Sequence, residues 1–295
     1  MLEDKGLETT LSFTTNLWAF HKKPSLWMDL FRHPRVGVTT SFQYGDARLK
    51  GDLTPLSEQE FINISNQFQA LVGYRPDFIS VIDQSNADSV LKTVQLARFL
   101  GVEAKINHVV ASGPEVEFRG VTMGGENSFW TKADMYAHYV AIYDAGLMEW
   151  EYNTKQMAKV LAEQNTTCPL ARDCDSGIRT LQPEQGYYSC GAFGDDRTHA
   201  IDFEREMAGE FFRPLSQDYE LLSMKASCFS CPMFAICNGC RKTIQDTKRF
   251  GMVEDHCRKM KALAPKIIEI NGLSGILEPT EYIDESPQLI DVVQA

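Results

Sequence analysis

The sequence has 295 residues, of which 43% are hydrophobic and 23% are charged, with a formal net charge of -11. This length allows one large domain or two ordinary ones with a substantial core, and the acidic balance argues against direct binding to nucleic acid or anionic membranes. The first residues carry no basic segment followed by an apolar run, and no apolar run approaches roughly twenty residues, so we expect a cytoplasmic protein without membrane association.

The first part of the chain alternates strands and helices. Segments rich in β-branched and aromatic residues predict strands at Leu7–Thr15, Arg35–Phe42, Phe78–Asp83 and Val102–Val110. Helices are predicted at Pro24–Phe31, from the capping-box pair Ser57 and Glu60 to Gly73, and from Asn86 or Asp88 to Gly101. Short connections between alternating strands and helices are typical of parallel βαβ units. We therefore expect an α/β fold, specifically a fragment of a parallel barrel.

A long loop and two further helices complete this part. Residues 111–130 include Gly124 and Gly125, and a loop of that length is usually functional or mobile. Thr131 and Asp134 predict another helix start, and a further helix is predicted at Met148–Glu163. After Asn165, cysteines, glycines and short segments replace the periodic pattern. The predicted domains are residues 1–165, an irregular cysteine-rich domain at 166–265, and a tail at 266–295.

All eight cysteines lie in this later part, and no cysteine precedes residue 168. They are Cys168, Cys174, Cys190, Cys228, Cys231, Cys237, Cys240 and Cys257. Close cysteine pairs on short loops direct two thiolates toward one metal or cluster. Eight thiolates complete two four-ligand sites, and clustered cysteines in a cytoplasmic protein are more often ligands than disulfides. Buried core thiols, structural zinc and iron–sulfur clusters are the three alternatives.

The cysteine order resembles the C-terminal auxiliary-cluster (SPASM) domain of radical S-adenosylmethionine enzymes, such as anaerobic sulfatase-maturating and peptide-modifying enzymes. The resemblance runs from Cys168 to Cys257 and implies two [4Fe-4S] clusters. It assigns the first cluster to Cys168, Cys174, Cys190 and Cys240, and the second to Cys228, Cys231, Cys237 and Cys257. The gap between Cys237 and Cys240 is one residue shorter than the common form.

Short segments of the N-terminal part are similar to the same enzymes. Thr15-Asn16 resembles their Thr-Asn-Gly turn, with Leu17 in the glycine place. Ser41 ends the second predicted strand, and the segment from Arg48 to Gly51 resembles their Arg-x-x-Gly segment. The resemblance implies that Asn16, Ser41 and Arg48 contact S-adenosylmethionine, although such residues are also common at strand ends and in loops without a cofactor.

Two departures shape the expected function. These enzymes carry Cys-x3-Cys-x2-Cys after the first barrel strand to hold the cluster that cleaves the cofactor, and this chain has no cysteine there. Its βα units therefore resemble the third to sixth units of a six-unit partial barrel, with a bare sheet edge able to pair with another chain. Gly191 also follows Cys190 where sulfatase-maturating relatives carry an aspartate used as a base.

The sequence thus predicts the C-terminal subunit of a split radical S-adenosylmethionine enzyme. A partner chain would supply the missing strands and the radical-generating cluster, and would share the S-adenosylmethionine. The auxiliary clusters would relay electrons or anchor a substrate, either a peptide or a small molecule. The alternative from another class is a non-catalytic scaffold, holding clusters or zinc, that presents substrate to a complete enzyme. A third alternative is that the sequence is part of a longer chain.

Overall fold

The computed structural model describes residues 6, 9–45, 49–50, 52–110, 130–162, 168–170, 179–182, 186–202, 204, 208, 224–237 and 240–271. The chain divides into two compact units, one comprising Met1–His108 with Asp144–Tyr152 and the other Val109–Tyr143 with Asn153–Ala295. Residues 163–167, around the predicted domain boundary, lie outside the described ranges. Within those ranges no helix is long and apolar enough to cross a membrane.

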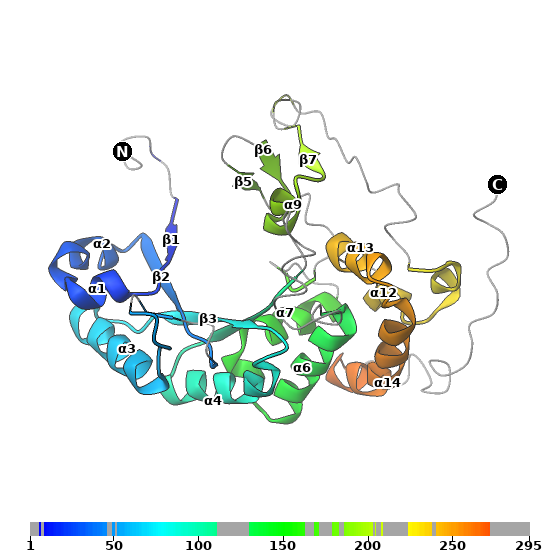
Figure 1. The fold of residues 1–295 in the computed structure, drawn as a ribbon, viewed down its shortest axis with the longest axis horizontal. Coiled ribbons are helices and arrows are strands. Elements are labelled where there is room, and N and C mark those ends of the chain that lie inside the picture. Colours follow the sequence, from blue (N-terminus) through cyan, green and yellow to red (C-terminus); the bar gives the residue numbers. More distant parts are fainter. Residues whose placement is uncertain are drawn as a thin grey trace. The chain divides into compact units, whose positions relative to one another are not determined.

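The first unit is built on a parallel sheet with the strand order β1-β2-β3-β4 (Figure 1). The strands are β1 (Leu11–Thr14), β2 (Val36–Ser41), β3 (Asp77–Ile82) and β4 (Ala104–His108). In register, Leu11 pairs with Val36, Thr40 with Phe78, and Phe78 with Ala104. Spatial order equals chain order, as expected when each connection crosses over to the neighbouring strand. The predicted α/β fold class is confirmed.

Helices connect the strands and cover the sheet. They are α1 (Trp18–Lys22), η2 (Pro24–Leu26), α2 (Met28–Phe31), α3 (Glu58–Val72), η3 (Ala87–Ser89), α4 (Val90–Leu100) and η4 (Met148–Trp150), where η marks a 3-10 helix. The predicted capping box starts α3, because the Ser57 hydroxyl accepts from the Glu60 N–H and the Glu60 carboxylate accepts from the Ser57 N–H. The helix ends at Gly73, whose φ of 105° is a conformation that glycine adopts without strain.

Two helix predictions in this unit were wrong in detail. The helix expected at Pro24–Phe31 is divided at Trp27 into η2 and α2, and the preceding α1 was not predicted. The helical segment predicted to start at Asn86 or Asp88 begins as η3, whose N-cap is Asn86, and continues as α4 from Val90; neither Asn86 nor the α4 N-cap Ser89 makes a side-chain cap bond. The Asn86 side chain instead accepts from the Asp83 N–H and donates to the carbonyls of Tyr44 and Val81.

A third prediction, the continuous helix at Met148–Glu163, was also wrong. Glu151 is extended and separates η4 from α7 (Tyr152–Leu161). Its backbone forms a parallel bridge with Ala104, and its Oε1 accepts from the Ile106 N–H at 2.8 Å. Because β4 uses Glu151 as a partner, the chain leaves the helical conformation at this residue.

Aromatic side chains form much of the core between the sheet and its helices. Phe42, Phe61 and Phe78 pack with residues of α4, and the rings of Phe42 and Phe61 stack with centroids 4.7 Å apart. In a second cluster, Phe20 of α1 lies against Phe68 of α3 with ring centroids 5.0 Å apart. The short α1 is therefore stabilised by packing rather than by its length.

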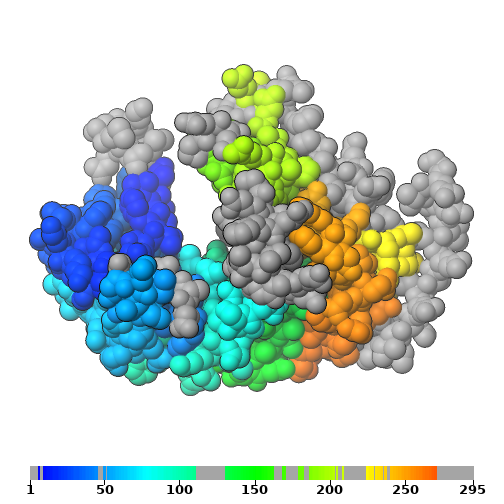
Figure 2. All heavy atoms as spheres, in the orientation of Figure 1, coloured from blue at the N-terminus to red at the C-terminus, as the bar shows by residue number. Residues whose placement is uncertain are grey.

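β1 is an edge strand whose side chains are exposed. All of its side chains are exposed, including those of Leu11 and Phe13, and the strand lies at the surface in the space-filling view (dark blue in Figure 2). Among the described residues, no strand pairs with its outer side. An uncovered edge with apolar side chains is a surface on which another strand can add.

The second unit consists of short elements and longer helices. They are α6 (Lys132–Asp144), α7, β5 (Thr180–Gln182), β6 (Gly186–Tyr188), α9 (Gly191–Asp196), β7 (Ala200–Ile201), η5 (Ala226–Ser230), α12 (Phe234–Cys237), α13 (Arg241–Arg249) and α14 (Val253–Asn271). Strands β5, β6 and β7 form a small antiparallel sheet. α14 continues through Pro265 into the predicted tail, and Ile267 and Ile268 on it are buried.

Candidate functional site

Four cysteine side chains line one pocket in the second unit. Cys228 lies in η5, Cys231 directly follows it, Cys237 ends α12, and Cys257 lies on α14. The pocket has an empty volume of about 350 Å³, part of it open to solvent. The other lining residues are Met224, Met233, Phe234, His256, Met260 and Lys261. We call this space the thiol pocket. Its cysteines are the four that the sequence resemblance assigns to the second cluster.

The thiols of this pocket influence one another electrostatically. The pKa of Cys237 is raised to about 12, chiefly because burial disfavours the thiolate and also because the other pocket thiols repel its charge, while Lys132 opposes the rise. The pKa of Cys257 is raised as well, first by burial, with Lys225 opposing. Thiolates here therefore need added positive charge, which a bound metal supplies by stabilising the deprotonated ligand.

Cys240 belongs to a different group of thiols. Its pKa is raised, first by burial and then by the nearby thiols of Cys168 and Cys190. Cys240 directly precedes α13 and Cys190 directly precedes α9, while the Cys168 sulfur accepts from the Leu170 N–H. Cys174, the expected fourth member, lies outside the described residues. The thiols of Cys237 and Cys240 thus associate with different groups, although the two residues are three positions apart.

The residues of the thiol pocket could hold either a single metal ion or an iron–sulfur cluster. A zinc ion bound by four sulfurs at about 2.3 Å holds those sulfurs about 3.8 Å apart. Within the described ranges, no three His, Cys, Asp or Glu side chains converge as ligands of one metal ion. The four cysteines of the pocket are donors of a type that ligates zinc as well as iron–sulfur clusters, and the other walls are mostly apolar.

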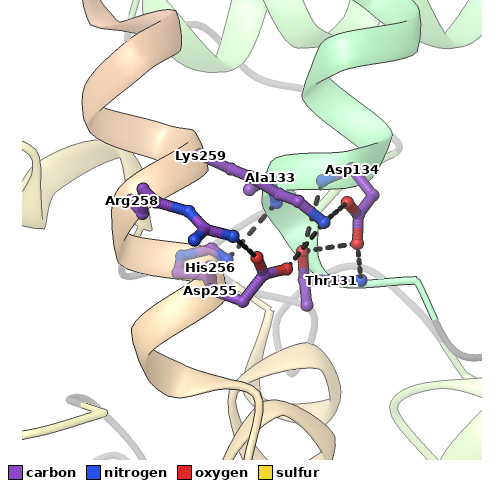
Figure 3. Close-up of polar contacts among 7 residues, drawn as sticks. All are labelled: Thr131, Ala133, Asp134, Asp255, His256, Arg258 and Lys259. Atoms are coloured by element: carbon purple, nitrogen blue, oxygen red, sulfur yellow. Dashed lines mark hydrogen bonds and ion pairs between the residues drawn. The ribbon is translucent and has the colours of Figure 1, made fainter. Parts of the chain in front are cut away.

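A polar network fixes α14 to the first turn of α6 (Figure 3). As predicted, Thr131 and Asp134 start α6: the Asp134 carboxylate accepts from the Thr131 N–H and hydroxyl at 2.9 and 2.7 Å. Lys259 of α14 bridges Asp134 at 2.7 Å and Asp255 at 2.6 Å. Because α14 also carries Cys257, this network positions one wall of the thiol pocket.

Two residues near the thiols were not predicted from the sequence. Lys132 is fully buried, donates from Nζ to the Ile236 carbonyl, and lies 5.4 Å from the centre of the Tyr136 ring. His256 is also fully buried, and burial, aided by the Lys132 charge, lowers its pKa to about 4. The sequence signal for His256 was its position beside Cys257, whereas nothing in the pattern marked Lys132 as buried.

A buried ion-pair cluster connects the helices that follow Cys190 and Cys240. Lys242 of α13 lies 2.6 Å from Asp196 of α9 and 3.0 Å from Asp246 of its own helix. Burial raises the pKa of Asp246 to about 6, although the charge of Lys242 opposes the rise. Lys242 thus pairs with two carboxylates. This ion-pair cluster helps to position the thiols of Cys190 and Cys240, which directly precede the two helices.

The residues proposed to contact S-adenosylmethionine fall at the carboxyl end of the parallel sheet. Asn16 follows β1 and Ser41 ends β2, which places both at the edge where open α/β sheets bind ligands. The Asn16 side chain also accepts from the Trp18 N–H at 3.0 Å. Leu17, in the family's glycine place, has a φ of 57°, the left-handed conformation that favours glycine. Arg48 lies outside the described residues.

Comparisons with protein-family profiles, with curated protein sequences and with solved structures found no match for this chain. The relation to radical S-adenosylmethionine enzymes therefore rests on the residues and spacings quoted above.

Proposed function

We propose that this chain is an iron–sulfur protein that holds two [4Fe-4S] clusters and acts as the C-terminal subunit of a two-chain radical S-adenosylmethionine enzyme. One observation supports it most: Cys237 shares the thiol pocket with Cys228, Cys231 and Cys257, whereas Cys240 associates with Cys168 and Cys190. This interleaving matches the assignment of ligands to two sites that the family resemblance implies.

The residues of the chain would hold the clusters and control their surroundings. When bound, such clusters supply one-electron transfer at potentials set by burial and hydrogen bonding. The methionine and phenylalanine walls of the thiol pocket limit the access of water. The Lys132 ammonium favours the negative charge of the nearby thiolate, because it acts against the rise in the Cys237 pKa. The clusters would then relay an electron to or from a substrate radical, or anchor a peptide or small-molecule substrate.

The exposed edge strand supports the presence of a partner chain. A parallel strand contributed by the partner would pair with the outer side of β1 and cover Leu11 and Phe13. The partner would also bring the Cys-x3-Cys-x2-Cys loop to the carboxyl edge of the sheet. There Asn16, Ser41 and Arg48 would contact S-adenosylmethionine shared between the chains. A reducing cytoplasm would keep all the cysteines available as ligands.

Iron content and its loss in single variants test the cluster assignment. Anaerobically purified protein should be brown and contain about eight irons per chain, as two [4Fe-4S] clusters require. Cys240→Ser should reduce iron to about four per chain and spare the second cluster's electron paramagnetic resonance signal. Cys237→Ser should remove the second cluster's signal, and its spectrum should match that of Cys257→Ser rather than that of Cys240→Ser. Matching spectra of Cys237→Ser and Cys240→Ser, or a colourless protein with stoichiometric zinc, would contradict the proposal.

Cofactor cleavage tests the role as a subunit. The chain alone should form no 5′-deoxyadenosine under dithionite, because fully ligated clusters leave no iron open for the cofactor. A neighbouring gene product carrying Cys-x3-Cys-x2-Cys should gain activity when the chain is added. In the complex, Arg48→Ala and Ser41→Ala should weaken cofactor use without changing iron content. Cleavage by the isolated chain would refute the split arrangement, and no gain on mixing would favour the scaffold alternative.

A further inference from the structure

His256 is a buried side chain with one hydrogen-bonding atom left over. It lies on α14 next to Cys257, is fully buried, and is one of the residues that line the thiol pocket. Its Nδ1 accepts from the Ala133 N–H of α6 at 3.4 Å (Figure 3). Its Nε2 has no hydrogen-bond partner among the described residues.

The bond from Ala133 determines which ring nitrogen carries the proton. An imidazole nitrogen accepts a hydrogen bond only through its free lone pair, so the proton of the neutral ring is on Nε2. Nδ1 and Nε2 lie on different sides of the ring, so the Nε2–H group is directed away from the Ala133 backbone. A buried N–H group without an acceptor is unfavourable, and its presence in a pocket wall points to a missing acceptor.

The walls of the pocket offer that acceptor only through sulfur. Met224, Met233, Phe234 and Met260 supply thioethers and a phenyl ring, which are weak acceptors or none. Thiolates and cluster sulfides carry negative charge and accept strongly in surroundings of low polarity. A role for His256 as an iron ligand is disfavoured, because its Nε2 is protonated and its Nδ1 is already bonded to Ala133.

We propose that the Nε2–H group of His256 donates a hydrogen bond to a sulfur of the cluster held by Cys228, Cys231, Cys237 and Cys257, and thereby raises the reduction potential of that cluster. This inference rests on the proposed function. The reduced cluster carries one more negative charge than the oxidised cluster, so a donor stabilises the reduced form more. His256 is then a positioning residue that acts on the potential, while the cysteines bind the iron.

A matched pair of variants separates the donor from the bond to Ala133. His256→Asn keeps an acceptor near the Nδ1 position and loses the Nε2–H donor. His256→Gln places an amide N–H near the Nε2 position. In a potentiometric titration, His256→Asn should lower the ratio of reduced to oxidised second cluster about tenfold at fixed potential, or about 59 mV for one electron. His256→Gln should retain most of the wild-type ratio, and the first cluster should not change in either variant.

A second measurement on the unaltered histidine covers the case in which a variant does not load iron. In the Cys240→Ser background, where only the second cluster is expected, ¹⁵N-histidine labelling and exchange into D₂O should reveal a coupled nitrogen and an exchangeable proton in the paramagnetic resonance of the reduced cluster. Absence of that coupling, or equal potentials for wild type and His256→Asn, overturns the inference while the cluster assignment stands. A protein without any iron–sulfur chromophore overturns the proposed function instead.

Discussion

Replacing Asp134 tests whether the network in Figure 3 holds α14 in place. Asp134→Ala removes the carboxylate that receives the Thr131 N–H and hydroxyl, which is half of the capping box, and loss of these hydrogen bonds costs about 1 kcal/mol. It also removes the ion pair with Lys259, worth about 0.5 to 1 kcal/mol because the lysine is 43% exposed. The free energy of local unfolding of α6 and α14 should therefore fall by about 1.5 to 2 kcal/mol.

Hydrogen exchange read by mass spectrometry can follow this change in one part of the chain. A loss of about 1.5 to 2 kcal/mol corresponds to exchange about 10- to 30-fold faster in peptides of α14, where opening is at equilibrium. Lys259→Met alone should have a smaller effect, because it removes no helix cap. The double variant should show a coupling energy of about 0.5 to 1 kcal/mol between Asp134 and Lys259.

A control variant on the same helix distinguishes this network from ordinary surface pairs. Glu269→Ala breaks the ion pair with Lys266, whose Nζ lies 2.7 Å from the Glu269 carboxylate within α14. It should change the free energy of local unfolding, read from the exchange rates, by less than about 0.5 kcal/mol. The reasoning is refuted if peptides of α14 exchange as slowly in Asp134→Ala as they do in Glu269→Ala. It is also refuted if the coupling energy is below about 0.3 kcal/mol, the error expected for independent sites.

Three further predictions concern burial. Burial raises the pKa of Asp246 from 3.8 to about 6, so the folded chain binds this proton more tightly than the unfolded chain does. The free energy of unfolding should therefore fall by up to about 3 kcal/mol as the pH rises from about 4 to about 6. Urea titrations of Asp246→Asn should lack this decline. Glu151→Ala removes the carboxylate acceptor of the buried Ile106 N–H bond and should cost about 1 to 3 kcal/mol, whereas Glu151→Gln should lose less than half as much, since it keeps an acceptor. Leu17→Gly relieves about 1 kcal/mol of backbone strain but loses a buried leucine, so thermal melting should show a net loss of about 2 kcal/mol, and a gain would contradict the packing argument.

The parts of the fold that depend on residues close together in the sequence could be predicted from it. The helix starts at Ser57 and Thr131 depend on side chains three positions away, and the end of α3 depends on one glycine, so local patterns were sufficient. The helix α1 was missed because Leu17 adopts a left-handed conformation there and Phe20 is stabilised by packing against distant rings.

Residues positioned by distant contacts could not be predicted. The bond between Ala133 and His256 joins residues 123 positions apart, and Glu151 leaves its helix because it pairs with β4. Spacing alone allowed a single local site formed by Cys228, Cys231, Cys237 and Cys240. Their separation into two groups followed from the family resemblance, because neither spacing nor propensity indicates which thiols a folded chain brings together.

The positions of Cys237 and Cys240 have a consequence for the variation in chain length that this protein can accept. Loops usually accept inserted residues, because closing a slightly longer loop costs little entropy. Here Cys237 and Cys240 are only three positions apart, and their thiols associate with different groups. We call this short segment between them the step. Adding or removing one residue between them, the same difference that separates this step from the common form of the resembling domain, would require adjustment around both groups at once. Substitutions elsewhere can accumulate singly, but a change in the length of this step would need coordinated changes around two centres.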